Sequence, residues 1–170
     1  QHLDLHVYSD SSYADFKDTS QSTCGFAAFL GNNLVSWGSP VQSTVALSVC
    51  EAECMGAVEA GKDSLFVANL VSEILAPNAA LSGPVKMFLD NKGAIFMNDN
   101  PVSAKRTRHI AVRWHWLRQK VSEKVFAISH VPTLDNVADL FTKPLDVTKF
   151  KKLCAVLFGW APAFHERIVV

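Results

Sequence analysis

The sequence predicts an α/β domain: a mixed five-stranded sheet flanked by helices. The chain has 170 residues, 49% of them hydrophobic and 19% charged, which is typical of one globular domain. Its N-terminal part consists of short apolar segments separated by polar turns, a pattern that predicts three antiparallel strands. After that part, helical periods alternate with single strands, so two further strands are reached by helical crossovers.

Each predicted strand has a local signal. The first alternates apolar and polar residues and ends at Ser9 and Asp10. The second and third flank a turn at Gly31, Asn32 and Asn33, which are typical hairpin residues. The predicted strands span residues 2–8, 22–30, 34–37, 85–89 and 124–130.

The predicted helices have start and stop signals. Ser48 and Glu51 have the spacing of a capping box at the start of the longest helix. Pro77 follows its end, and a later helix is strongly basic. The predicted helices span residues 48–76, 91–98, 107–121, 135–141 and 147–157. Residues 1–158 are therefore assigned to one domain, and residues 159–170, which show no period, to a C-terminal tail.

The composition limits the compartment and the partners. No apolar run approaches the roughly 20 residues that a membrane helix needs, and the four cysteines lack the spacing of a metal site or redox motif. We expect free, mostly buried thiols and an intracellular protein. The net charge of the chain is zero, but residues 1–90 carry a net charge of −7 and residues 91–170 a net charge of +7. Such asymmetry suits a metal site beside an anion-binding surface, although ordinary solvated charges could also segregate in this way.

Four acidic residues lie where elements begin or end. Asp10 ends the first predicted strand, Asp90 ends the fourth, Glu53 lies near the start of the long helix, and Asp139 lies in the short helix after the last strand. If they converge, they repel one another unless cations lie between them, and their hard oxygen atoms favour Mg²⁺ or Mn²⁺. Their spacing alone does not decide whether these residues form a metal site, because acidic residues are also common where a strand ends at the solvent-exposed surface.

Six segments occur in a recognisable order along the chain. They are YSDSSYAD at 8–15, STCGFAAFLG at 22–31, SWGSPVQSTVALSVCEAEC at 36–54, FLDNKGAI at 88–95, KRTRHIAVRWHWLRQKV at 105–121 and VPTLDNVADLFTKPL at 131–145. Together they resemble the ribonuclease H domain of the Pol polyprotein of copia-type LTR retrotransposons, over about residues 7–158. The resemblance implies a ribonuclease H fold and two Mg²⁺ ions, for which Mn²⁺ can substitute. It also implies hydrolysis of the RNA strand of RNA–DNA hybrids during reverse transcription.

The resemblance also implies roles for the four carboxylates. Asp10, Asp90 and Asp139 match the family's catalytic and metal-binding aspartates. Asp10 would hold both ions, Asp90 and a glutamate would hold the ion near the leaving group, and Asp139 would help to hold the ion that carries the attacking water.

Two glutamates compete for the fourth position. Glu51 and Glu53 are two residues apart, so on a helix they point in nearly opposite directions. Glu51 has the capping role with Ser48, whereas Glu53 begins a stripe of small residues that allows close packing on the sheet. Those small residues are Gly56, Ala57 and Ala60. Related ribonucleases H also have a small residue after the glutamate, so we predict that Glu53 is the ligand and keep Glu51 as the alternative.

The basic helix predicts a surface that follows nucleic-acid phosphates. Its basic residues are Lys105, Arg106, Arg108, Arg113, Arg118 and Lys120. We expect Arg106 and Arg108 to contact phosphate, and Ser11, Ser12 and Asn91 to contact the 2′-hydroxyl groups of RNA. The alternative is a solvated basic helix face with Trp114 and Trp116 in the core. The spacing of His109 and His115 does not favour metal binding, and their roles stay open.

These features favour a nuclease that acts on RNA–DNA hybrids and is attached to a reverse transcriptase domain in the same polyprotein. With no membrane segment, we expect it in cytoplasmic retrotransposon particles. The main alternative is a catalytically inactive module that binds nucleic acid or supports the reverse transcriptase. An integrase or transposase relative is disfavoured, because those enzymes place their glutamate late in the chain.

Overall fold

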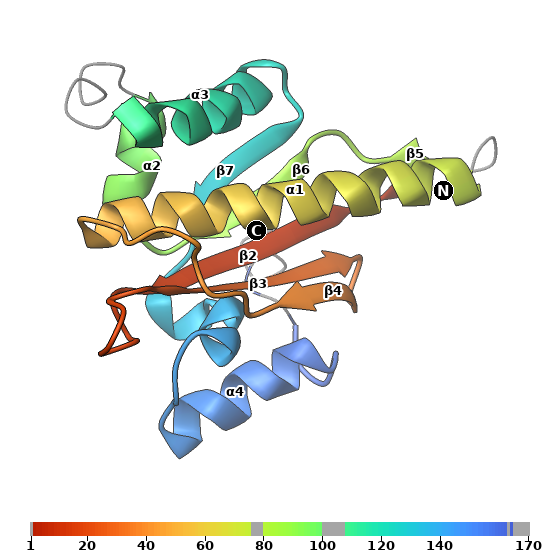
Figure 1. The fold of residues 1–170 in the computed structure, drawn as a ribbon. Helices are drawn as coiled ribbons and strands as arrows, with labels where there is room; N and C mark the ends of the chain where they lie inside the picture. Colours follow the sequence, from red (N-terminus) through yellow and green to blue (C-terminus); the bar gives the residue numbers. More distant parts are fainter. Residues whose placement is uncertain (1, 76–79, 100–107, 163, 165–170) are drawn as a thin grey trace.

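The computed structural model describes residues 2–75, 80–99, 108–162 and 164 (Figure 1). In chain order, the elements are β1 (His2–Leu3), β2 (Leu5–Ser12), β3 (Thr23–Leu30), β4 (Asn33–Gly38), α1 (Val49–Leu75), β5 (Ala80–Leu81), β6 (Val85–Leu89), α2 (Lys92–Asp99), α3 (Arg108–Ser122), β7 (Phe126–His130), the 3₁₀ helices η2 (Thr133–Asp135) and η3 (Val137–Phe141), and α4 (Val147–Leu157). The main sheet has the strand order β4-β3-β2-β6-β7. β2, β3 and β4 are antiparallel, and β6 and β7 are parallel to β2, so the predicted mixed sheet is confirmed.

Helices cover both faces of this sheet (Figure 1). On one face, α1 and α3 pack on a core that includes Val7, Ala57 and Leu117. On the other face, η3 and α4 pack on a second core that includes Tyr8 and Val156. Because successive residues of β2 point to opposite faces, this central strand contributes to both cores. β2 is thus held from both sides, which fixes the backbone that carries Asp10.

The first predicted strand is wrong in its bounds. His2 and Leu3 form the separate strand β1, which pairs with β5 in a small parallel sheet. The main strand β2 continues through Ser12, and Asp10 lies inside it, opposite Gly25 of β3. The polar residues from Ser11 to Gln21 suggested a loop, but Ser11 and Ser12 belong to β2, and short side chains fit between the sheet and α1. Strand pairing with β3 therefore outweighs the local preference of serine for turns.

Two glycines allow neighbouring elements to approach the sheet beside Asp10. A Cβ atom on Gly56 of α1 would lie 2.4 Å from Ser11 Oγ and 3.2 Å from the Asp10 carbonyl oxygen. A Cβ atom on Gly25 would lie 2.7 Å from the Ala138 carbonyl oxygen of η3. Such distances leave no room for any side chain. Close packing from both faces therefore converges on the same residue of β2.

The C-terminal end of the described chain contacts the second core. Ala161 and Phe164 are partly buried against it, although the sequence predicted a tail from residue 159. The domain boundary at residue 158 stays a prediction. The four cysteines are free: Cys24 and Cys54 are buried, as expected, whereas Cys50 and Cys154 are partly exposed. No helix in the described ranges is both long and apolar enough to cross a membrane.

Candidate metal centre

Three aspartates from distant parts of the sequence converge at the centre of the sheet. One carboxylate oxygen from each of Asp10, Asp90 and Asp139 lies within 4.8 Å of the others. The parallel pairing of β2 and β6 explains part of this convergence, because Ser9 pairs with Leu89 and the next residue of each strand is the aspartate. Asp139 reaches the same point from η3, which packs against β2.

Asn136 links η3 to β2 by a hydrogen bond and so positions Asp139. Its side-chain Nδ2 donates a 3.0 Å hydrogen bond to the Ser9 carbonyl oxygen. Its Oδ1 accepts a 3.2 Å hydrogen bond from the Ala138 amide and caps η3. Asn136 is fully buried. This role has no separate signal in the sequence, because an asparagine before a short helix is also an ordinary cap.

Asp10 and Asp139 are held by basic and hydroxyl side chains. The Thr142 hydroxyl donates a short hydrogen bond to Asp10 Oδ2. The Lys143 ammonium lies 3.2 Å from Asp10 Oδ2 and 2.6 Å from Asp139 Oδ1. Lys149 of α4 forms a close ion pair with Asp139 Oδ2. We did not predict these three residues, although Thr142 and Lys143 follow Asp139 by three and four positions, a spacing that brings side chains together on a helical turn.

The structure separates the two candidate glutamates as their spacing predicted. The Glu51 amide donates a hydrogen bond of 3.2 Å to Ser48 Oγ, and Glu51 Oε2 accepts one of 2.8 Å from the Leu47 amide. Glu51 is therefore part of the helix cap. Glu53 is 5% exposed, and its Oε2 is buried with no hydrogen-bond partner among the described residues.

The electrostatics place Glu53 beside the aspartates. Burial, together with the negative charges of Asp10 and Asp90, raises the pKa of Glu53 to about 9. Burial and the neighbouring Asp139 raise the pKa of Asp10 to about 6. Burial also acts to raise the pKa of Asp139, but hydrogen bonds with Asp10, Lys143 and Lys149 outweigh it, so this pKa lies below its usual value. The cluster therefore holds more negative charge than its own environment stabilises.

These residues fit a hard divalent cation. All the candidate ligands are carboxylate oxygens, which Mg²⁺ and Mn²⁺ prefer. Three of the carboxylates converge closely, and the buried Glu53 oxygen beside them lacks a partner, which is costly for a polar atom unless an ion or a proton satisfies it. The structure brings the four predicted residues together, and their roles as ligands stay a prediction.

The predicted RNA contacts have different surroundings. Ser11 is 5% exposed, and its hydroxyl donates a 2.9 Å hydrogen bond to the Ala52 carbonyl oxygen of α1. The Ser12 hydroxyl is buried without a partner in the described structure. The Asn91 side chain accepts a 3.0 Å hydrogen bond from the Ala94 amide and so caps α2. Contacts of these residues with a substrate stay predictions.

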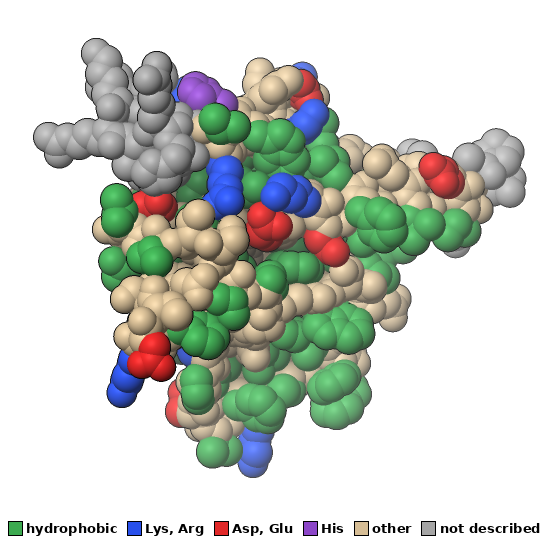
Figure 2. All heavy atoms as spheres, viewed as in Figure 1, with side chains coloured by type: hydrophobic (Ala, Val, Ile, Leu, Met, Phe, Trp, Pro, Cys, Tyr) green, Lys and Arg blue, Asp and Glu red, His purple; other side chains and the backbone are tan. Residues whose placement is uncertain are grey.

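Part of the predicted basic surface belongs to the described structure. Arg106 lies outside the described residues, as does the side chain of Arg108, and their phosphate contacts stay predictions. Basic side chains lie beside acidic ones where α3 lies against α1 (Figure 2). Trp114 is 6% exposed and belongs to the core, which agrees with the alternative that places the tryptophans there. Trp116 packs against Phe126.

A hollow of about 230 Å³ lies on the α1 face of the sheet. Its lining includes Cys24, which pairs with Ser11 across β2 and β3, and Gln42. Arg113 of the basic helix α3 brings a positive charge to this hollow, and Glu59 of α1 brings a negative one. None of the four candidate metal ligands is among its lining residues.

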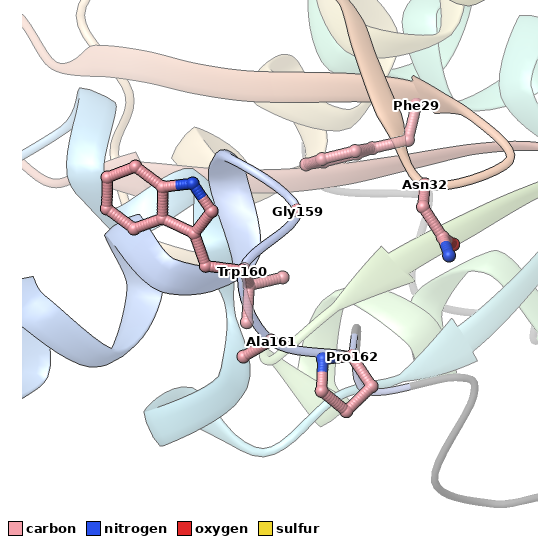
Figure 3. A pocket seen from close by; sticks show the side chains of 7 residues that line it. Phe29, Asn32, Gly159, Trp160, Ala161 and Pro162 are labelled. Atoms are coloured by element: carbon pink, nitrogen blue, oxygen red, sulfur yellow. The ribbon is translucent and has the colours of Figure 1, made fainter.

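A second hollow of about 230 Å³ lies away from the carboxylates (Figure 3). The C-terminal segment with Gly159, Trp160, Ala161 and Pro162 closes it against Phe29 and Asn32. None of its lining residues is acidic or basic. It therefore lacks the groups that a metal ion or a phosphate would need.

The strand order and the carboxylates at the centre of the sheet define the ribonuclease H-like fold class, and solved structures agree. The chain is similar to LC11-RNase H1 isolated from compost, with a TM-score of 0.60 and 12% identity over 82% of this chain and 92% of that one. It is also similar to the N-terminal RNase H domain of Rv2228c from Mycobacterium tuberculosis, with a TM-score of 0.58 and 12% identity over 91% and 96% of the two chains. At such identities the likeness concerns the fold.

The chain is homologous to retrovirus-related Pol polyproteins of transposons. It is 35% identical to those of transposons RE1 and RE2 from Arabidopsis thaliana, over 90% and 88% of this chain. It is 32% identical to that of transposon TNT 1-94 from Nicotiana tabacum, over 91%. The chain spans about a tenth of the length of these relatives, as 10% of RE1, 10% of RE2 and 11% of TNT 1-94 are covered. No model of a protein family matches the sequence.

Proposed function

We propose that this chain is a metal-dependent nuclease that hydrolyses the RNA strand of RNA–DNA hybrids. The single observation that carries the proposal is the convergence of Asp10, Asp90 and Asp139 within 4.8 Å, with the buried and unpartnered Glu53 beside them. A soluble fold does not need three neighbouring carboxylates, since their mutual repulsion destabilises it. Such a cluster is better explained by cation binding.

The four carboxylates would hold Mg²⁺, with Mn²⁺ as a substitute. As the family resemblance implies, Asp10 would help to hold both of two ions, Asp90 and Glu53 would help to hold one of them, and Asp139 the other. When bound, two such ions supply an activated water and stabilise the leaving oxygen of a phosphodiester. The chain itself contributes positioning: Asn136 and Thr142 orient Asp139 and Asp10, and Gly56 lets α1 bring Glu53 close to β2.

The basic helix α3 supports a nucleic-acid substrate. Arg113 would attract phosphates of the strand that passes the aspartates, and phosphate contacts would make binding sensitive to salt. Among the structures with a similar fold is LC11-RNase H1 in complex with an RNA/DNA hybrid, at a TM-score of 0.57. The Pol polyprotein relatives favour reverse transcription as the process, with a reverse transcriptase domain as the partner and cytoplasmic particles as the place of action.

A labelled RNA–DNA hybrid tests the proposal. We expect the wild-type chain with Mg²⁺ or Mn²⁺ to cut the RNA strand and to leave free single-stranded RNA and duplex DNA intact. Asp10→Asn should abolish cutting, whereas the control Asp18→Asn, which changes an exposed loop carboxylate, should not. Equal cutting by wild type and Asp10→Asn would refute the mechanism. A folded wild-type chain that binds hybrids and never cuts them would support the alternative of an inactive module.

A further inference from the structure

Two lysines place positive charge inside the carboxylate cluster. Lys143 follows η3, and its ammonium contacts both Asp10 and Asp139, at 3.2 and 2.6 Å. Lys149 lies in the first turn of α4 and pairs with the other oxygen of Asp139. We call Lys143 and Lys149 the lysine pair. Three elements, β2, η3 and α4, are thus joined through charges at one point.

The direct contacts of the lysine pair lie on one side of the cluster, although the charge of Lys143 also acts to lower the pKa of Glu53. Both ammonium groups contact Asp139, and Lys143 also contacts Asp10. No ion pair of Asp90 or Glu53 with a lysine or arginine is found in the described part of the chain, and Glu53 Oε2 is without a partner. The space between Asp10 and Asp139 therefore already contains a cation, whereas the space between Asp90 and Glu53 does not.

An ammonium group and a divalent ion cannot share the space between Asp10 and Asp139. Mg²⁺ binds carboxylate oxygens at about 2.1 Å, and Lys143 Nζ lies 2.6 Å from one of the same oxygen atoms. An ion there would meet the ammonium at contact distance, where like charges repel strongly in a partly buried site. Binding an ion at this position therefore requires the ammonium to leave.

The two lysines differ in their freedom to leave. The side chain of Lys143 is 39% exposed, so it can swing into solvent without unpacking its surroundings. The side chain of Lys149 is 11% exposed. Its helix is fixed by Asp146, whose Oδ1 accepts hydrogen bonds from the Thr148 and Lys149 amides at 2.9 and 3.0 Å. Lys143 is thus the movable member of the lysine pair and Lys149 the fixed one.

We propose that Lys143 is a resident counter-ion that sets the order of metal loading. The first divalent ion binds on the side of Asp90 and Glu53, and a second enters between Asp10 and Asp139 only by displacing the Lys143 ammonium. Lys143 is a positioning residue in this scheme, because it acts through Asp10 and Asp139. The inference rests on the proposed function only in its assignment of these carboxylates as ligands.

Charge counting supports this order. The four carboxylates carry four negative charges when ionised, and the lysine pair carries two positive ones. The remaining two negative charges match one divalent ion. A second ion would raise the net charge of this group to +2 if both ammonium groups stayed, and to only +1 if the Lys143 ammonium leaves. Displacement of Lys143 therefore lowers the electrostatic cost of the second ion, and the remaining excess of positive charge makes that ion the weaker one.

Mn²⁺ binding to the 170-residue chain, without nucleic acid, tests this proposal. Titration calorimetry and the electron paramagnetic resonance signal of free Mn²⁺ give the number of bound ions and their affinities. We expect the wild type to bind one ion at least tenfold more tightly than the second. Lys143→Met keeps the length of the side chain and removes its charge, so it should bind the second ion at least tenfold more tightly than the wild type, with the first ion little changed.

Two further variants separate charge from structure. Lys152→Met is the matched control, because Lys152 pairs with Asp135 outside the cluster, at 2.9 Å, and it should bind Mn²⁺ like the wild type. Lys143→Arg keeps the charge and should keep the weak second site. Melting temperatures give an independent readout: Lys143→Met should melt lower than the wild type in EDTA and gain more from Mn²⁺.

Three outcomes would overturn the proposal. They are equal affinity of the wild type for both ions, an unchanged second affinity in Lys143→Met, or the same change in the Lys152→Met control. The first of these requires only the wild type, so the test holds even if a variant fails to fold. A chain that never cuts hybrids can still pass this test, and a chain that cuts them can fail it. Failure of the loading order is thereby distinguished from failure of the proposed nuclease activity.

Discussion

The two sides of the carboxylate cluster are stabilised in different ways. On the η3 side, Asp10 and Asp139 are surrounded by the Thr142 hydroxyl and the ammonium groups of the lysine pair. On the α1 side, Glu53 is buried with an unpartnered oxygen, and burial and its acidic neighbours raise its pKa to about 9. The η3 side is folded around charges that the chain itself supplies.

This difference indicates which part of the cluster depends on an added cation. A buried ion pair is strongly destabilised when one partner is removed, because the other charge is left without compensation. A buried carboxylate without a cation already has that cost and takes up a proton to avoid it. Removing a charge should therefore destabilise the η3 side and stabilise the α1 side of the metal-free protein. Variants that remove a charge from one side or the other test these opposite effects on stability.

Asp139→Asn should have the largest effect. It removes a carboxylate that is fully buried, leaves Lys149 without its partner and leaves Lys143 paired with Asp10 alone. We expect a loss of about 3–5 kcal/mol of unfolding free energy in EDTA and a fall in hybrid cleavage of at least roughly 10²–10³-fold. Urea unfolding and cleavage rates measure the two effects. Asp135→Asn breaks the more exposed pair with Lys152 and should cost less than about 1 kcal/mol. Similar losses in both variants would contradict the buried role of Asp139.

The buried carboxyl group on the α1 side should make the stability of the metal-free protein depend on pH. Because the pKa of Glu53 rises to about 9 on folding, the folded chain holds a proton that the unfolded chain has released above about pH 4.5. Metal-free stability should therefore fall as pH rises from about 5 to 9, by an amount on the order of 5 kcal/mol. Unfolding in EDTA across this range measures it.

Glu53→Gln is the control for that pH dependence. It should flatten the slope and make the metal-free chain more stable than wild type at pH 8, because glutamine carries no charge to bury. Saturating Mg²⁺ should also reduce the slope in wild type, since the ion stabilises the ionised form. A slope that Glu53→Gln leaves unchanged would assign the titration to another group.

The two glycines beside Asp10 allow the packing of the two sides to be compared. Alanine at Gly25 would place its Cβ 2.5 Å from Thr142 Cγ2 and 2.7 Å from the Ala138 carbonyl oxygen, so η3 must move away from the sheet. We expect about 2 kcal/mol of destabilisation. Gly56→Ala meets the Ser11 hydroxyl, but alanine favours the helix by about 1 kcal/mol, so its net cost should be smaller. Chemical denaturation ranks the two variants, and the reverse order would contradict this account.

Local patterns were enough to predict most of the fold and the four acidic residues. β6 and α4 have the predicted bounds, because a short apolar run before Asp90 and a periodic helix after Pro144 each have clear start and stop signals. The end of β2 was mispredicted, since pairing with β3 is a tertiary effect. Lys149 and Asn136 could not be predicted as parts of the site. Their positions depend on how α4 and η3 pack on the sheet, which no local spacing encodes.

The smallest expected effect concerns the choice between Glu51 and Glu53. Glu51 accepts the Leu47 amide at the start of α1, so Glu51→Gln should cost only about 0.5–1 kcal/mol of stability through a weaker cap. It should leave Mn²⁺ affinity within twofold of wild type, whereas Glu53→Gln should lower the affinity for the first ion at least tenfold. Calorimetric titration of the two variants in parallel measures the difference. If Glu51→Gln weakens Mn²⁺ binding as much as Glu53→Gln does, then Glu51 contributes to the centre and its capping role is secondary.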